Sequence, residues 1–201
     1  MNQLIEKYKK NIGSNSVKLK STRKKLLLSS MIRLVIFIIS FSSAYYFFGN
    51  TPIVILSIVL GIVGFLLLLS KHTDLVSVKK YLKTIIEVNE NEINALNNDL
   101  SAFKNGSDYN DPLHHFSHDI DLFGDHSFFH NVNRTNRKES ELLLASMLSS
   151  NSIDDIESKQ KSIKELADKL DWRQNYSVST KMIEAEVSSK AIFTWLNEYK
   201  S

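Results

Sequence analysis

Histidine and aspartate are concentrated in one short stretch of the chain, and these side chains are good ligands for zinc and non-haem iron. Eight of them fall within seventeen positions: His114, His115, His118, Asp119, Asp121, Asp125, His126 and His130. Their spacing lacks the His-Glu-x-x-His pattern that places two histidines on one helix face. Because a loop does not fix a coordination geometry, we assign no metal ligands. We expect several of these residues to satisfy backbone groups instead.

Other reactive patterns are missing from the sequence. Without cysteine the chain has no disulfides, thiolate catalysis or cysteine-based zinc sites, and no Gly-x-Ser-x-Gly elbow is present. The glycines do not fit the spacing of a phosphate-binding loop: Gly13, Gly49, Gly61, Gly64, Gly106 and Gly124. Arg134, Arg137, Lys138 and Trp172-Arg173 lack a basic, aromatic-lined surface around them and are interpreted as solvated helix faces. We assign no catalytic or cofactor-binding residue to this chain.

Two long apolar runs precede the histidine-rich stretch. Residues 52–70 contain no charge and correspond to about 28 Å of helix, close to the hydrocarbon thickness of a bilayer. Residues 29–48 form the other run, whose one charge, Arg33, lies near an end from which a long side chain reaches the headgroups. Only Gly49-Asn50-Thr51 separate the runs. The sequence therefore predicts a two-helix transmembrane hairpin over residues 29–70.

Basic residues flank the outer ends of both runs. Residues 1–25 hold eight Lys or Arg against one acid, Glu6, and four lysines follow the second run closely. The positive-inside rule therefore predicts that both termini are cytoplasmic, with the hairpin in the cell (inner) membrane. A cleaved signal peptide is the alternative for the first run, since Ser42-Ser43-Ala44 resembles a cleavage site. The long basic region and the second run argue against it.

Two further features of this region have simple explanations. Ser57 and Gly61 lie four residues apart and can let a neighbouring helix approach closely, but small residues are common in such spans. The basic N-terminal region can bind anionic lipid headgroups, although fixing the topology explains it equally. We prefer the simpler explanation for both.

The chain continues as an amphipathic segment of about thirty residues. Its apolar residues recur at spacings of three and four: Leu75, Val78, Leu82, Ile85, Ile93, Leu96, Leu100 and Phe103. Asn89 takes the place of one apolar member. It either sets the register of a coiled coil or lies in a helix packed within its own domain, and the sequence leaves both open. Gly106 and Pro112 then predict a loop over residues 104–118.

Helical patterns dominate the remainder. One Leu-rich segment covers residues 139–148 and Asn151-Ser152 is a plausible cap; Ile153, Ile156, Ile163, Leu166 and Leu170 mark the next face, and a last helix covers about 179–199. No sustained period-two pattern occurs, so the predicted fold class is all-α. Residues 71–201 hold sixteen basic and twenty-one acidic residues. This acidic balance suits phosphate binding poorly, so we expect no appreciable DNA binding.

One succession of motifs is more specific. Asp121-Leu122-Phe123-Gly124 precedes Asn133-Arg134-Thr135, then Leu143-Leu144-Ala145 with Leu148, and finally Lys159-Gln160 ahead of Glu165-Leu166. Residues 119–172, about a quarter of the chain, thereby resemble the start of the helical core of the MutS family, the DNA mismatch-recognition ATPases. The chain departs from the family pattern at Ser140, where a glycine is usual, and at Met147, where a tryptophan is usual.

The resemblance implies a particular setting. In the family this segment begins the core and lever helices, which connect the DNA clamp to the ATPase. Anchored members have a two-span hairpin in place of the mismatch reader and continue to a C-terminal ATPase. The resemblance thus implies an N-terminal portion without the ATPase and mismatch-reading domains, or a degenerate short form. ATP and Mg²⁺ are expected only if an ATPase domain follows, so this chain alone is not expected to be an enzyme.

The predicted organisation has four parts: a basic cytoplasmic tail over 1–28, the transmembrane hairpin over 29–70, an amphipathic linker helix over 71–104 and a partial MutS-like helical core over 105–201. The leading hypothesis is a non-catalytic, membrane-anchored MutS-like protein, related to DNA mismatch repair. The alternative is a self-contained membrane scaffold with a helical cytoplasmic domain. The expected partners are the lipid bilayer and either a second copy or other helices, with DNA not among them.

Overall fold

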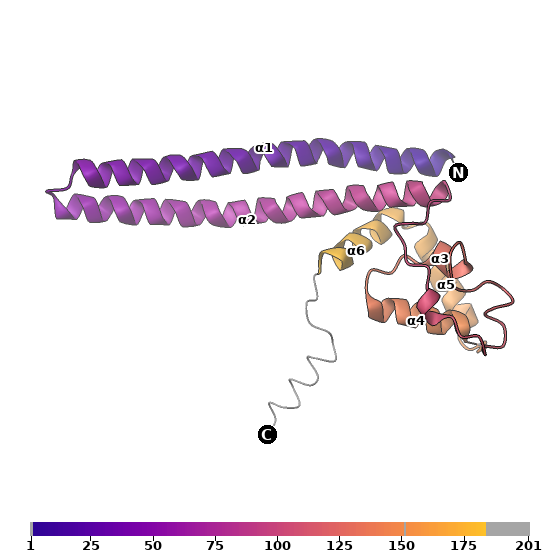
Figure 1. Cartoon of the computed structure of the whole chain (residues 1–201). Helices are drawn as coiled ribbons and strands as arrows, with labels where there is room; N and C mark the ends of the chain where they lie inside the picture. Colours follow the sequence, from indigo (N-terminus) through magenta and orange to yellow (C-terminus); the bar gives the residue numbers. More distant parts are fainter. Residues whose placement is uncertain (1, 151, 184–201) are drawn as a thin grey trace, which may run out of the picture. The chain divides into compact units, whose positions relative to one another are not determined.

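The computed structural model describes residues 2–150 and 152–183, and all regular structure within them is helical (Figure 1). The all-α prediction is confirmed for this part of the chain. The protein divides into two compact units. We call Met1–Asn97 the hairpin unit and Asn98–Ser201 the head unit. Asn151 of the predicted cap and most of the predicted helix over 179–199 lie outside the described residues.

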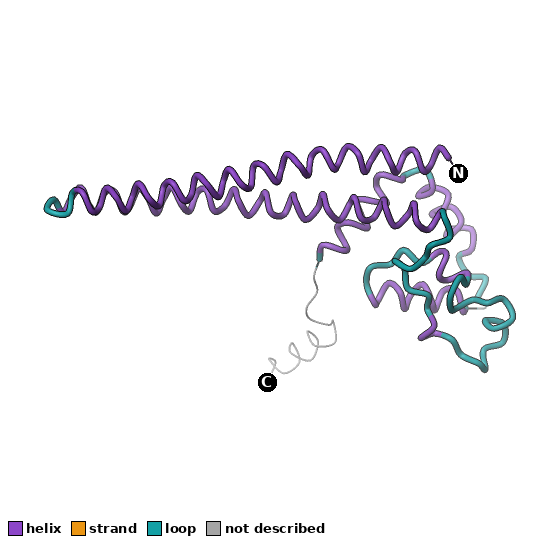
Figure 2. Tube along the Cα trace, turned by 45° about the horizontal axis from the view of Figure 1, so that its top comes forward, coloured by secondary structure: helices purple, strands orange, loops and turns teal. Residues whose placement is uncertain are grey.

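Two long helices make up the hairpin unit. Helix α1 covers Asn2–Tyr46 and α2 covers Thr51–Leu96, and the two run antiparallel around a short turn (Figures 1 and 2). Pro52 lies in the first turn of α2, where its missing N–H costs no helical hydrogen bond. Each helix is long and apolar enough to span a membrane, by length and composition. Helix α1 continues through the predicted tail without a break, and α2 continues from the second apolar run into the predicted linker as far as Leu96.

Buried and partly buried residues recur regularly along the whole of α1. These positions alternate at spacings of three and four: Ile5, Tyr8, Ile12, Asn15, Leu19, Thr22, Leu26, Ser29, Arg33, Ile36, Ser40 and Ser43. The matching line on α2 begins Val54, Ser57, Gly61, Gly64, Leu68, His72, Leu75, Lys79 and Leu82. Such spacing is typical of two helices packed side by side. We call the interface formed by these two lines of residues the seam. The basic N-terminal region therefore forms one half of a helix pair.

Small residues bring the two helices into close contact in the apolar half. The Ser43 and Ser57 hydroxyl oxygens lie 2.9 Å apart and share a hydrogen bond. A Cβ placed on Gly61 would collide with Ser40 Oγ and would lie 2.9 Å from Ser40 Cβ. We preferred to explain Ser57 and Gly61 by the general frequency of small residues in such spans. That interpretation is wrong, since both residues lie on the seam and permit the approach of α1.

Helix α2 ends earlier than the sequence pattern predicts. It stops at Leu96, and Asn98 takes a positive φ of 66°, a left-handed conformation that asparagine tolerates better than most residues. Leu100 and Phe103 therefore lie beyond the helix instead of on its apolar face, although Leu100 is buried. Asn89 is fully buried in α2, and its amide nitrogen donates to the Ile85 carbonyl at 2.7 Å.

Short helices and long connections make up the described part of the head unit. They are the 3₁₀ turn η1 (Ser107–Tyr109), α3 (Phe128–Val132), α4 (Lys138–Ser149), α5 (Ile156–Ala167) and α6 (Leu170–Met182). The rings of Tyr109, Phe123 and Phe129 form a cluster with centroids 5.4 to 5.9 Å apart. Phe129 and Leu122 are almost completely buried, so this cluster lies at the centre of the unit's packing.

The apolar face predicted over residues 153–170 is not a buried face. Ile153, Ile156 and Ile163 are exposed, whereas Leu170 is buried but belongs to the next helix, α6. The helix is interrupted at Asp168 and Lys169, between α5 and α6. The apolar positions on either side therefore do not form one continuous helical face. The predicted continuity is therefore wrong.

Candidate functional site

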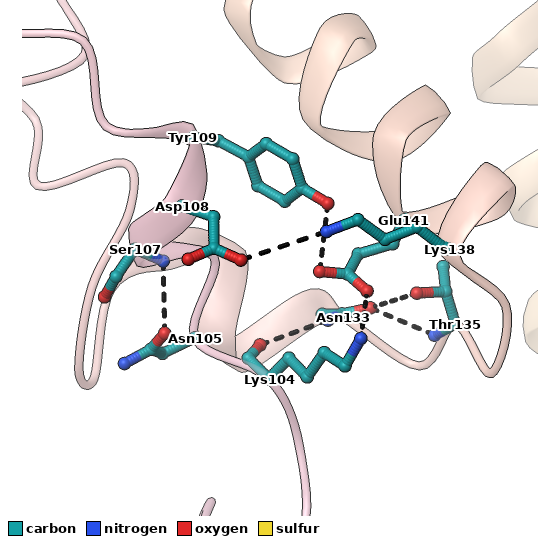
Figure 3. A network of polar contacts seen from close by, with 9 residues as sticks. All are labelled: Lys104, Asn105, Ser107, Asp108, Tyr109, Asn133, Thr135, Lys138 and Glu141. Atoms are coloured by element: carbon teal, nitrogen blue, oxygen red, sulfur yellow. Dashed lines mark hydrogen bonds and ion pairs between the residues drawn. The ribbon is translucent and has the colours of Figure 1, made fainter.

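A buried carboxylate joins two segments of the head unit. Glu141 in α4 is only 3% exposed. One carboxylate oxygen, Oε1, accepts a hydrogen bond from the Tyr109 hydroxyl at 3.0 Å, and the other, Oε2, accepts from Lys104 Nζ at 2.7 Å (Figure 3). Lys138 Nζ lies 5.1 Å from the centroid of the Tyr109 ring. These contacts fasten the loop before α3 to the first turns of α4.

The charge state of Glu141 follows from its partners. Burial raises the pKa of this carboxyl, but the hydrogen bonds from Lys104 and Tyr109 and the nearby positive charges of Lys104 and Lys138 outweigh burial and lower it below its ordinary value. Glu141 is therefore a charged acceptor at neutral pH. Because both oxygens are engaged by neighbours, its position suits holding the loop in place more than transferring protons.

Asn133 ties the same loop from a second side. Its side chain is buried, and its Nδ2 donates to the Lys104 carbonyl at 3.1 Å. Its Oδ1 accepts from the backbone N–H of Thr135 at 3.0 Å and from the Thr135 hydroxyl at 2.7 Å (Figure 3). The Asn-x-Thr motif thus closes a tight turn and secures the backbone at Lys104 through one buried amide.

The Asp-Leu-Phe-Gly motif also has a structural position here. Leu122 is 2% exposed, and its carbonyl accepts from the Phe129 N–H at 3.0 Å. Asp121 has a φ of 46° and Gly124 a φ of 114°, so the motif turns sharply at both ends. The Gly124 N–H donates to the Asn105 carbonyl at 2.9 Å, which again secures the loop. At this φ any residue other than glycine would be strained.

Two of the histidines, His114 and His130, are used for backbone contacts. His130 Nδ1 accepts from the His126 N–H at 3.1 Å, while Nε2 lies 3.0 and 3.1 Å from the Leu100 and Phe103 carbonyls. The bonds therefore assign His130 as a neutral ring with its proton on Nε2. His114 follows the same scheme, with Nε2 3.0 Å from the Ser149 carbonyl. Across residues 2–150 and 152–183, no three His, Asp or Glu side chains form a group that could hold a metal.

A hollow of about 380 Å³ adjoins Glu141. The loop from Ser101 to Asp108 forms much of its lining, together with Asp125, His130 and Glu141. The polar groups around it already have partners: Asp125 accepts from Asn105 Nδ2 at 2.7 Å, and His130 and Glu141 are bonded as described. The hollow therefore has an acidic and polar wall whose side chains mainly hold one another.

Arg134 is also engaged within the head unit. The Arg134 guanidinium lies 3.9 Å from the centroid of the Phe103 ring and donates to the Asn131 and Asn133 carbonyls. The Trp172 and Tyr176 rings stack with centroids 5.4 Å apart on an exposed part of α6. The interpretation of these residues as plain solvated faces missed the ring contact of Arg134.

Sequence reasoning did not single out Lys104, Tyr109 or Glu141. Glu141 stands in a Leu-rich segment, where an acid reads as part of a solvated face, and Tyr109 precedes it by 32 residues. Asn133 and Thr135 were identified from the sequence as part of the family resemblance, as were Leu122 and Gly124 of the Asp-Leu-Phe-Gly motif. No model of a protein family, no curated protein and no solved structure matches this chain.

Proposed function

We propose that this chain is a membrane-anchored, non-catalytic MutS-like protein, related to DNA mismatch repair by its head unit and anchored in the cell membrane with both termini in the cytoplasm. One observation supports the MutS-like part above the others. The resemblance rests on sequence motifs, and three of their residues, Leu122, Gly124 and Asn133, lie at the turns and buried bonds that organise the head unit. A chance likeness of surface residues would carry less weight.

The exposed surface of the hairpin unit supports the membrane anchor. Between Met31 and Leu69, large apolar side chains such as Phe37, Phe41 and Leu67 are more than 60% exposed. Soluble proteins rarely expose apolar patches larger than a few hundred Å². A lipid environment covers this surface without any further protein.

Single cysteines test the anchor and its orientation, because the chain has no cysteine of its own. In intact expressing cells, a maleimide that does not cross the bilayer should label Asn50→Cys from outside. It should label Ser16→Cys and Ser101→Cys only after permeabilisation. Labelling of all three positions in intact cells would contradict the proposed orientation, and extraction of the protein by alkaline carbonate would contradict the anchor itself.

The reading frame beyond Ser201 tests the MutS-like part most directly. A continuation that encodes a nucleotide-binding loop of the Gly-x-x-x-x-Gly-Lys-Ser/Thr type would support the proposal. A stop without such a continuation or neighbouring gene would count against it. DNA titration of the full chain at physiological salt should show no appreciable binding, and a submicromolar, salt-sensitive affinity would overturn that expectation.

A self-contained scaffold is the second candidate, and the exposed apolar side chains of the head unit favour it. In α4, Leu142, Leu143 and Met147 are exposed while the acid Glu141 is buried. Ile163 in α5 and Trp172 in α6 are exposed as well. Photo-crosslinkers at Leu143 and Ile163 separate the candidates. Capture of a protein with a nucleotide-binding loop favours the MutS-like role, whereas stable capture of a partner without one favours the scaffold.

A further inference from the structure

Three polar atoms on the seam of the hairpin unit are buried and have no hydrogen-bond partner in the described part of the chain. They are Ser29 Oγ and Arg33 Nε on α1 and His72 Nδ1 on α2. Buried polar atoms almost always find a partner, so each exception requires an explanation. Three exceptions in one unit, two of them on neighbouring turns of the same helix, point to one location.

The register of the two helices places these residues together. The seam pairs Ser43 with Ser57, Ser40 with Gly61 and Ile36 with Gly64. In an antiparallel pair, a step of three or four residues along one helix is matched by an equal step backwards along the other. Continuing this register places Leu68 opposite Arg33 and His72 opposite Ser29. The three unpartnered atoms therefore lie within about one helical turn of each other along the seam.

The Arg33 side chain extends toward the N-terminus of α1. Its Nη2 donates to the Ser30 hydroxyl at 3.2 Å, three residues nearer that terminus. Helical side chains tilt in this direction, which carries the guanidinium from its own turn to the level of Ser29 and Ser30. His72 and its neighbour Lys71 are at this same level by the register. By this register, the Arg33 guanidinium, the Ser29 hydroxyl and the His72 imidazole lie at one level of the seam, and the exposed Ser30 and Lys71 lie beside it.

No acid lies on the turns of α1 around Arg33. Between Glu6 and Asp74 the sequence contains no carboxylate, and Arg33 forms no ion pair within residues 2–150 and 152–183. The level also coincides with the ends of both apolar runs, at Ser29 on α1 and Ser70 on α2. In the membrane orientation proposed above, it is the level of the cytoplasmic headgroups.

We propose that Arg33, His72 and Ser29 form a site for the phosphate of an anionic phospholipid. A guanidinium presents a rigid fork of N–H donors that matches phosphate oxygens, and a hydroxyl and an imidazole N–H each add a donor. The site differs from attraction to the basic N-terminal region, which is spread over many lysines and depends on the surface potential. The inference rests on the proposed membrane anchor, which the cysteine labelling above tests separately.

Lipid retention by the purified full chain tests the site. The chain is reconstituted into nanodiscs of equal parts phosphatidylcholine and phosphatidylglycerol, re-extracted in mild detergent and analysed for bound lipid by native mass spectrometry. Arg33→Gln should reduce retained phosphatidylglycerol by about tenfold, the scale expected for a lost charge-assisted contact. His72→Ala and Ser29→Ala should reduce it less. Arg33→Lys, which keeps the charge without the fork, should restore only part of the retention.

Arg23→Gln is the matched control. It removes the same charge from an exposed position on the same helix. It should leave retention within about twofold of the wild type, because a single surface charge contributes little when no specific contact is lost. Equal losses in Arg33→Gln and Arg23→Gln would show diffuse attraction and overturn the site, and so would unchanged retention in Arg33→Gln.

Competition with inorganic phosphate and membrane fractionation complete the experiment. Displacement of the lipid by millimolar inorganic phosphate would show that the site takes free phosphate and would overturn the assignment to lipid. Arg33→Gln must also remain in the alkaline-resistant membrane fraction, as the wild type does. If the variant is integral but retains less lipid, the site is supported. If the wild type itself is not integral, the proposed anchor fails first, and the site fails with it.

Discussion

The two units of this protein are both helical, yet different interactions organise them. In the hairpin unit, a repeating line of sheltered positions runs along α1 and α2, and small residues at Ser40 and Gly61 set how closely the helices approach. In the head unit, short helices are connected by loops whose backbone is secured by single side chains such as Asn133 and His130. A repeated pattern tolerates many substitutions, whereas a loop secured by individual bonds does not.

Replacing Phe129 by alanine should produce the largest difference between the units. The Phe129 side chain is fully buried and packs against Tyr109, Phe123 and the backbone at Gly106. A buried phenylalanine truncated to alanine costs about 3–5 kcal/mol, much of the stability of a small unit. Hydrogen exchange of the full chain in detergent should show lost protection in the head unit and unchanged protection in α1 and α2. Phe128→Ala, at an exposed neighbour, should change neither.

Gly61→Ala should affect the hairpin unit alone. The added Cβ meets Ser40 at distances that side chains do not tolerate, which forces the helices apart at a cost of about 1–3 kcal/mol. The readout is oxidative crosslinking between Ser43→Cys and Ser57→Cys, which should slow markedly. Gly64→Ala is the control, since its Cβ makes only ordinary contact with Ile36 at 3.8 Å. If Ser40→Gly fails to restore crosslinking in Gly61→Ala, the steric explanation is wrong.

Acid should weaken the head unit through Glu141 and have less effect on the hairpin unit. The partners of Glu141 lower the pKa of its carboxyl in the folded state. Its stabilising contribution is therefore complete above the unfolded value of about 4.3 and is lost as the pH falls through the lower folded value. Chemical denaturation between pH 6 and pH 3, values chosen to bracket about 4.3, should show a steeper loss in the wild type than in Glu141→Gln. Parallel curves would contradict this role for the Glu141 carboxylate.

The smallest effect is expected at the exposed pair of Lys169 and Glu165. The two side chains are half exposed or more and lie on successive turns, four residues apart. Pairs of this kind contribute about 0.3–0.5 kcal/mol, and salt screens them. Lys169→Ala should therefore change the unfolding midpoint of the head unit only slightly. A loss comparable to that of Phe129→Ala would mean that the α5–α6 junction stabilises the unit more than its exposure indicates.

The sequence allowed the hairpin to be predicted because its signal is carried by long runs of similar residues. The amino-acid composition of residues 29–48 and 52–70 is enough to distinguish them from the rest of the chain. The pairing of the N-terminal region with α2 was missed, because basic residues surround its seam and because Asn15, Thr22 and Ser29 occupy positions that are usually apolar. A pattern made partly of polar residues is weak in the sequence and becomes evident only once the partner helix is present.

The contacts at Glu141 could not be predicted for a different reason. Lys104 and Tyr109 reach it from 37 and 32 residues away, across connections without regular structure. Nothing in the local pattern of α4 distinguishes a buried acid from a solvated one. The motif residues Leu122, Gly124 and Asn133 were identified by likeness, and their role in securing the loop became apparent only from their bonds and backbone angles.

The unbroken course of α2 has a mechanical consequence. A helix rises about 1.5 Å per residue, so the part from Ser70 to Leu96 extends about 39 Å. A paired helix of this length bends little, and its far end keeps a nearly constant distance from the level of Ser70. With the apolar half in a bilayer, the length of α2 would set the distance of Leu96, the last residue of the helix, from the lipid surface. Inserting or deleting whole turns between Leu75 and Leu96 would change that height in steps of about 5.4 Å.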